Sequence, residues 1–194
     1  MYSAGYADKD YRGHDYKGQA HVTGDKHVLA VVEGATENTV VVQALLDNLV
    51  GRGLDPTVPR LFIVDGAKAL SKAIRNTFGV AAAIQRCQVH KGRNIIERLP
   101  LHLHASVKKA LRQAWDQDDA DKAERLLRNL ARRLEHEEPG VSGSVLEGLN
   151  EILTVIRLGL PHELRRWQNR QAMQRHEKFP AVLELDRWIN PADQ

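Results

Sequence analysis

The sequence predicts an α/β fold that continues into an all-helical region. Three short runs of strand-forming residues lie at 26–32, 61–64 and 80–87. Each is too short for a helix and is bounded by turn residues. Between these runs, apolar residues recur three and four positions apart, as on one face of a helix. The resulting order of strand, helix, strand, helix and strand favours parallel pairing through right-handed crossovers.

The first predicted strand, Lys26 to Val32, is followed by an amphipathic helix. Thr36 or Asn38 can cap that helix, because their side chains accept hydrogen bonds from the first free amides. Gly51 and Gly53 end it. Its apolar stripe consists of Val42, Leu45, Leu46 and Leu49. We therefore expect these four side chains to face the core.

The second predicted strand, residues 61–64, ends abruptly at Asp65 and Gly66. A helix over 67–78 follows, and Gly79 is its expected stop. This order places a carboxylate at the carboxyl end of a buried strand, which is the edge where ligands bind in open α/β sheets. Taken alone, an Asp-Gly pair after a strand is more typical of a turn or a helix cap.

The third predicted strand, Val80 to Cys87, leads into a basic helix that begins near Lys91. That helix carries His90 and Arg93 close to its start. An acid at Asp65, a histidine and several cations would then meet near one edge of the sheet. Such a combination is compatible with phosphate chemistry, although the residues alone do not specify the reaction.

Beyond this point the pattern is helical. We expect one helix over 104–115, a second over 118–137, and a third that a Ser144-x-x-Glu147 capping box opens and that runs through Leu158. From Lys91 to Leu134 there are 11 Lys and Arg against 6 Asp and Glu, a local charge of +5. These helices could cover a phosphate backbone. Solvated outer faces would give the same pattern.

The composition is that of an ordinary globular protein, with 42% hydrophobic and 27% charged residues in 194. No apolar run approaches the ~20 residues that a membrane span needs. The first residues lack the apolar segment of a secretory signal, and the single cysteine excludes an internal disulfide. We therefore expect a cytoplasmic protein. The net charge of +3 supports nucleic-acid binding only weakly.

Two segments of the core resemble those of a known family. VDGAKALSKAIRNTFG, followed by QRCQVHKGRN, resembles the core of the mutator-type transposases that many bacterial insertion sequences encode. The resemblance extends over about 25–166. Three further segments in the same order support it, namely EGATEN (33–38), GLDP (53–56) and LTVIRLGLP (153–161).

The resemblance implies a fold and a domain order. The fold is α/β, with a partial ribonuclease-H-like core in which a mostly parallel sheet is flanked by helices. The core would span 25–94, and an all-helical insertion would follow over 95–160. Residues 1–24 lack any clear periodicity, and we expect a poorly ordered N-terminal segment there. Residues 161–194 are expected to form a helical or irregular tail.

The resemblance also implies an activity. Members of the family cut and rejoin DNA with divalent metal, so Mg²⁺ or Mn²⁺ is the expected cofactor. The expected partners are DNA, as insertion-sequence ends and target DNA, and further copies of the chain in a homo-oligomer, with no membrane. Asp65 matches the second catalytic aspartate and would bind the metal, while Cys87 and His90 match a Cys-x-x-His signature.

The match to the catalytic residues is incomplete at both ends. Asp8, Asp10 and Asp15 precede the first predicted strand, and none of them ends an apolar run. Glu177 is the carboxylate nearest the position of the family's glutamate, but its surroundings differ. These departures suggest a truncated or frame-shifted copy. An inactive remnant with weak, non-specific DNA binding is therefore the alternative to an active transposase.

Several candidate binding residues have a structural alternative. Lys68 and Lys72, together with His90, Lys91 and Arg93, are candidate DNA contacts, whereas solvated helix residues are the plainer interpretation. Cys87 and His90 could form half of a zinc site, which would need more ligands. Those ligands would be His102, His104 or carboxylates, and a buried cysteine is the simpler interpretation. A small-molecule α/β domain is disfavoured, because no glycine-rich phosphate loop is present.

Overall fold

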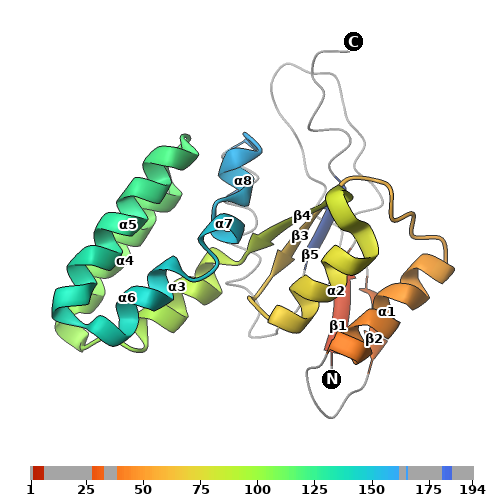
Figure 1. The fold of residues 1–194 in the computed structure, drawn as a ribbon, viewed down its shortest axis with the longest axis horizontal. Helices are drawn as coiled ribbons and strands as arrows, with labels where there is room; N and C mark the ends of the chain where they lie inside the picture. The colour runs from red at the N-terminus through yellow and green to blue at the C-terminus, as the bar shows by residue number, and fades with distance from the viewer. Residues whose placement is uncertain (1, 7–27, 33–38, 162–164, 166–180, 185–194) are drawn as a thin grey trace. The chain divides into compact units, whose positions relative to one another are not determined.

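The structure is a computed structural model that divides the chain into two compact units (Figure 1). We call residues 1–83 with 178–194 the α/β unit, and residues 84–177 the helical unit. The predicted α/β class is confirmed. Within the residues that the structure describes, no helix is both long enough and apolar enough to cross a bilayer. The described residues are 2–6, 28–32, 39–161, 165 and 181–184.

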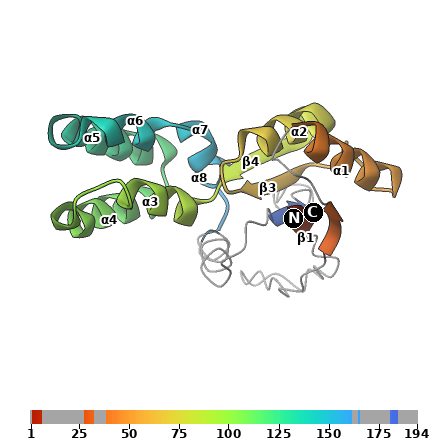
Figure 2. The ribbon, with the colours of Figure 1, turned by 90° about the horizontal axis from the view of Figure 1, so that it is seen from below.

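Two helices of the α/β unit, α1 (Thr39–Gly51) and α2 (Lys68–Phe78), pack side by side (Figure 2). Gln43 Nε2 of α1 donates to Thr77 Oγ1 of α2 over 2.8 Å. Gly79 follows α2 with a φ of 52°, so the predicted stop is confirmed. The predicted caps at Thr36 and Asn38 lie outside the described residues. The predicted stripe of α1 is buried as expected, namely Val42, Leu45, Leu46 and Leu49.

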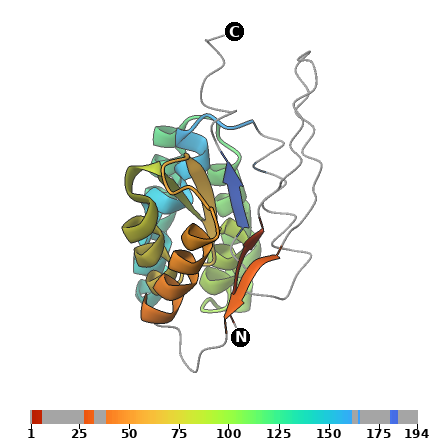
Figure 3. The same ribbon diagram turned by 90° about the vertical axis from the view of Figure 1, so that its right-hand side faces the viewer.

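The strands of the α/β unit form two sheets. In one, β1 (Tyr2–Tyr6) pairs antiparallel with β2 (Val28–Val32), as Figure 3 shows. In the other, β3 (Arg60–Val64) is the central strand, in the order β4–β3–β5. It pairs antiparallel with β5 (Ala181–Glu184) and parallel with β4 (Ala82–Arg86). The division between the two units falls within β4, after Ala83.

The prediction of a mostly parallel sheet is thus confirmed only for β3 and β4. The strand β2 pairs with β1 rather than with β3. Both β1 and β5 lie in segments for which the sequence predicted no strand. Their hydrogen-bond partners are distant in the sequence, so local periodicity carries little information about them.

The helical unit consists of two layers of helices (Figure 2). One layer contains α3 (Gln88–Ile96) and α4 (Leu101–Trp115). The other contains α5 (Ala120–Glu137), α6 (Pro139–Leu146) and α7 (Leu149–Ile152), and the short α8 (Thr154–Arg157) follows. The apolar faces of α4 and α5 pack together, which agrees with the amphipathic spacing of both segments.

The segment 80–87 is a shorter strand than predicted. Residues Gly79–Ala81 form a 3₁₀ turn, and Val80 is fully exposed, so β4 begins only at Ala82. The helix after it begins at Gln88 rather than near Lys91. The 3₁₀ turn continues directly from the end of α2, and 3₁₀ turns are common at helix ends.

The predicted helix from Ser144 to Leu158 is wrong. Ser144 lies inside α6, which begins at Pro139, and Glu147 is the C-cap of that helix. Gly148 then adopts a φ of 70°, in the left-handed region. Proline is favoured in the first turn of a helix and glycine just after its end. Pro139 and Gly148 therefore start and end the helix earlier in the chain than the capping-box pattern predicts.

Candidate functional site

Asp65 lies at the carboxyl end of β3, all five residues of which are buried. Its side chain is half-buried, and Oδ1 accepts a hydrogen bond from the Ala67 amide over 3.1 Å. Gly66 has a φ of 109°, a conformation that only glycine adopts readily. Among the described residues, Oδ2 of Asp65 has no hydrogen-bond partner. The carboxylate thus stabilises the turn through one oxygen and can offer the other to a ligand.

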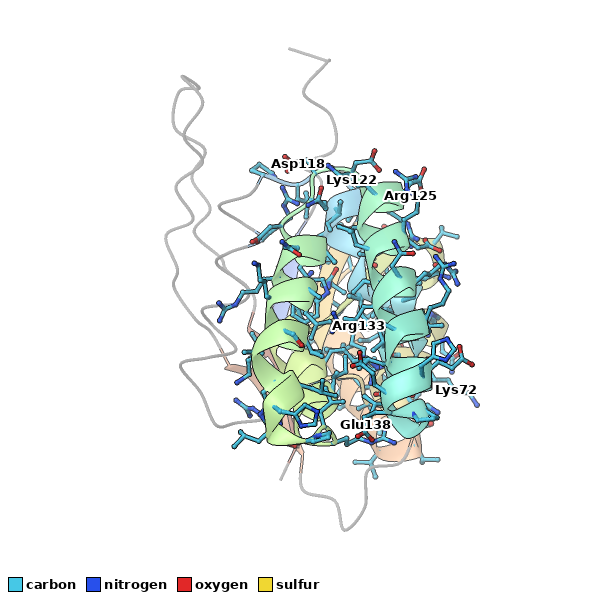
Figure 4. All side chains as sticks on the ribbon, turned by 90° about the vertical axis from the view of Figure 1, so that its left-hand side faces the viewer. Lys72, Asp118, Lys122, Arg125, Arg133 and Glu138 are labelled. Atoms are coloured by element: carbon cyan, nitrogen blue, oxygen red, sulfur yellow. The ribbon has the colours of Figure 1, made fainter. Side chains whose placement is uncertain are left out.

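Lys68 and Lys72 lie on the first two turns of α2, directly after this turn. Both side chains are exposed, and Lys72 is labelled in Figure 4. The placement is compatible with phosphate contacts and equally with a solvated helix surface. Their DNA-binding role therefore stays a prediction.

Cys87 and His90 lie where β4 joins α3. Cys87 is buried, with 5% of its surface exposed, and its carbonyl accepts a hydrogen bond from the Lys91 amide over 3.0 Å. His90 is half-buried in the first turn of α3. Both residues are thus held by the strand-to-helix junction.

The predicted further zinc ligands His102 and His104 lie on α4. Nε2 of His104 lies 2.9 Å from the carbonyl oxygen of Leu99, within hydrogen-bonding distance. His102 is exposed on α4. Across the ranges that the structure describes, no three His, Cys, Asp or Glu side chains gather to hold a metal ion. The described residues therefore give the zinc interpretation no support.

Lys91 is almost completely buried, with 1% of its surface exposed. Its Nζ lies 3.3 Å from Oε2 of Glu147, and Nη1 of Arg86 lies 3.6 Å from the same oxygen. Burial lowers the pKa of the Lys91 ammonium, the Arg86 charge adds to this effect, and the hydrogen bond to Glu147 opposes it. Lys91 thus pairs its buried ammonium with a partly exposed carboxylate, whereas Arg93 is exposed.

Gln85 makes buried hydrogen bonds at the same junction, a role that the sequence analysis did not predict. Its amide is fully buried and donates to the carbonyls of Arg86 and Ile152 over 2.7 and 2.8 Å. Its Oε1 accepts from the Val155 amide over 3.0 Å, and Thr154 Oγ1 donates to the Ile84 carbonyl over 2.6 Å. The segments QRCQVH and LTVIRLGLP are therefore in direct contact. The glutamine within the predicted strand 80–87 is the feature of the sequence that could have indicated this role.

The predicted site residues are divided between the units. Those of the α/β unit are Asp65, Lys68 and Lys72, and those of the helical unit are Cys87, His90, Lys91 and Arg93. The carboxylates considered for the remaining catalytic positions lie outside the described residues, namely Asp8, Asp10, Asp15 and Glu177. Asp65 is therefore the one predicted catalytic carboxylate whose surroundings the structure describes.

The chain is similar to transposases of bacterial insertion sequences. Over 101 residues it is 36% identical to the transposase for insertion sequence element IS6120 of Mycolicibacterium smegmatis, a match covering 52% of this chain and 30% of that protein. Over 130 residues it is 30% identical to the transposase for insertion sequence element IST2 of Acidithiobacillus ferrooxidans. That match covers 67% of this chain and 43% of the relative, so less than half of either relative is spanned.

A profile of the family described as "Transposase, Mutator family" matches residues 20–173. The matched region contains Asp65 and its turn, the β4–α3 junction and the helices of the helical unit. It therefore includes both segments that carried the resemblance. The chain belongs to the Mutator family of transposases.

Proposed function

We propose that this chain contributes to metal-dependent cleavage and transfer of DNA strands, with Asp65 as a ligand of Mg²⁺ or Mn²⁺. The observation that carries the proposal is the position of Asp65 at the carboxyl end of a buried strand, where Oδ2 has no hydrogen-bond partner among the described residues. The relatives support it, because both are transposases for insertion sequences. Insertion-sequence ends and target DNA are the expected substrates, and a homo-oligomer is the expected assembly.

We also infer a ribonuclease-H-like core. The connection from β3 through α2 to β4 joins two parallel strands, as such a core requires. The hydrogen bond from the Ala67 amide orients the Asp65 carboxylate at the start of α2. The Asp65 carboxylate would thereby be a metal ligand at a fixed position on the edge of the sheet.

The residues fit a metal in part. A hard cation such as Mg²⁺ prefers oxygen ligands and keeps several waters, so a single carboxylate oxygen is a suitable first ligand. When bound, the metal would polarise phosphodiester oxygens and stabilise the charge that develops on them. Asp65 would bind and orient this ion, while Lys68 and Lys72 on α2 would attract the phosphate backbone.

Calorimetric titration of the full chain with Mg²⁺ and with Mn²⁺ tests the proposal. Asp65→Asn retains an oxygen that accepts the Ala67 amide, so the turn is preserved while the charge is lost. We expect this variant to bind metal at least about tenfold more weakly, because the ion loses its anionic ligand. Asp47→Asn, an exposed carboxylate on α1 of the same unit, is the matched control and should bind as the wild type does.

Two results would contradict the metal site. Equal affinity in the wild type and in Asp65→Asn would place the bound metal elsewhere. No heat at millimolar metal would favour the alternative, a non-catalytic member of the family with at most weak DNA binding. Far-ultraviolet circular dichroism of each variant confirms that the fold is retained.

A further inference from the structure

Helix α4 carries three cationic side chains and no Asp or Glu over its 15 residues. Its cationic side chains, Lys108, Lys109 and Arg112, are all exposed. They lie opposite the buried stripe of the same helix, which is formed by Val107, Leu111 and Ala114. We call these three exposed cations the α4 basic face.

The charge of the α4 basic face is not compensated locally. Within the part of the chain that the structure describes, none of its three cations forms an ion pair. In the second layer, Arg128 and Arg157 both pair with Glu124, over 2.7 and 2.9 Å, and Arg133 lies 3.9 Å from Glu137. Lys122, Arg125 and Arg132 of α5 are exposed without such a pair among the described residues, but α5 also carries four carboxylates, namely Asp121, Glu124, Glu135 and Glu137. Five cations against four anions leave α5 with a charge of +1, whereas three cations and no anion leave α4 with +3.

The side-chain view of this unit agrees with the contrast. Figure 4 shows α4 and α5 next to each other, with Asp118 beside Lys122 and Arg125 at one end of the pair and Glu138 at the other. Helix α5 and its flanks thus carry both acidic and basic groups. The charged side chains of α4 are all cations.

The spacing on α4 suits a phosphate backbone. Lys108 and Arg112 are four residues apart, which is about 6 Å along a helix axis. One DNA strand presents a phosphate about every 3.4 Å of duplex axis, so three adjacent cations can reach neighbouring phosphates. The exposed residues next to them include the small or polar Ala105, Ser106 and Gln113, and the exposed apolar Leu101 lies at the start of the same helix.

We propose that the α4 basic face binds the phosphate backbone of duplex DNA without reading its sequence. The inference rests on the proposed function in one respect, namely that DNA is the substrate. It adds a second contact region, in the helical unit, which is separate from the metal site at Asp65. Its role is to hold the duplex through charge, because flexible lysine and arginine side chains contact phosphates in any sequence.

The test compares two triple variants of the full chain. Lys108→Gln, Lys109→Gln and Arg112→Gln together remove the α4 basic face. Glutamine has nearly the helix propensity of lysine and arginine, so α4 should be retained. The control triple carries the same charge change on the ion-paired arginines, namely Arg128→Gln, Arg133→Gln and Arg157→Gln.

The probe is a fluorescein-labelled duplex of random sequence, and the readout is anisotropy between 50 and 200 mM salt. EDTA removes divalent metal, so the result does not depend on Asp65. Each phosphate contact adds about 0.9 to the slope of log affinity against log salt. We expect the α4 triple to lower this slope by about 2.7 and the affinity at the lowest salt by at least about tenfold. The control triple should change both far less.

Several outcomes would overturn the inference. One is an α4 triple that binds as the wild type does, and another is a control triple that loses as much as the α4 triple. A wild-type chain that does not bind duplex DNA at 50 mM salt would also overturn the inference. If polyglutamate displaced the labelled duplex at a lower concentration of charge than unlabelled DNA does, the α4 basic face would be assigned to an acidic protein partner instead. The DNA measurement is made without divalent metal, so a failed metal titration leaves this test intact.

Discussion

Glu147 is the residue whose importance is least visible in the sequence. Its carboxylate, 48% exposed, is the partner of Lys91 and lies 3.6 Å from Arg86, both of which are buried. Two cations therefore share one anion. Such an arrangement is sensitive to loss of the anion, because a buried charge without a partner is costly.

We predict that removing the anion of this ion pair lowers the stability of the protein more than removing the lysine does. Glu147→Gln leaves Lys91 and Arg86 without a counter-charge and should lower the free energy of unfolding by about 1–3 kcal/mol, less than for a fully buried pair because Glu147 is partly solvated. Lys91→Met removes a desolvated charge while Arg86 still pairs with Glu147, so its effect should stay within about 1 kcal/mol. Urea unfolding at pH 7 measures both, and equal losses would contradict this assignment.

The same lysine predicts a pH dependence. The pKa of Lys91 is lowered in the folded state relative to 10.5, chiefly by burial. As pH rises from the folded-state pKa toward 10.5, the unfolded chain holds the proton that the folded chain has released. The stability of the wild type relative to Lys91→Met should therefore increase over that alkaline window and become constant above it. A difference that falls with pH would refute the lowered pKa.

At the scale of elements, Gln85 links β4 to α7 and α8 through hydrogen bonds to Ile152 and Val155. Gln85→Leu would leave the Ile152 carbonyl and the Val155 amide without the hydrogen bonds that Gln85 makes to them. Gln88 Nε2 still lies 3.4 Å from the Ile152 carbonyl, so the Val155 amide is the group that loses its side-chain acceptor. An unsatisfied buried group costs about 1–3 kcal/mol, and a loss in this range is expected. Gln113→Leu, on the exposed side of α4, is the control and should change the stability by less than about 0.5 kcal/mol.

The end of α6 depends on a glycine that a side chain would strain. Gly148 has a φ of 70°, and a Cβ there would lie 2.8 Å from Nη1 of Arg86. Gly148→Ala should destabilise the protein by about 1–2 kcal/mol. Gly143→Ala, inside α6 with open space around it, should instead stabilise by about 0.5–1 kcal/mol. Thermal unfolding of both variants checks the opposite signs, and a shared sign would contradict the assigned backbone conformation.

At the scale of the whole molecule, the two units have separate cores. Ile74 is buried in the α/β unit and Leu127 in the helical unit, each with 1% exposure. We predict that Ile74→Ala and Leu127→Ala each cost about 2–5 kcal/mol and weaken hydrogen-exchange protection mainly in their own unit. Mass spectrometry of amide exchange measures this peptide by peptide. Equal loss of protection in both units from either variant would show one cooperative unit instead.

The candidate site was only partly predictable. The strand–Asp–Gly–helix pattern located Asp65 correctly at the carboxyl end of β3, because strand length and turn chemistry are local properties. The burial of Lys91 was not predicted. Its sequence context is that of a basic helix start, whereas in the structure its side chain is buried and its ammonium pairs with Glu147, 56 residues later.

The sequence by itself determined helices α1, α2, α4 and α5, the buried stripe of α1, the stop at Gly79, and the segments that mark the Mutator family. These features follow from spacing and backbone preference within a few residues. Only the tertiary structure decided the partners of β1 and β5, the early end of α6 and the pairing of Lys91 with Glu147. Each of these depends on residues far apart in the chain, or on two local signals that favour different ends, and packing selects among them.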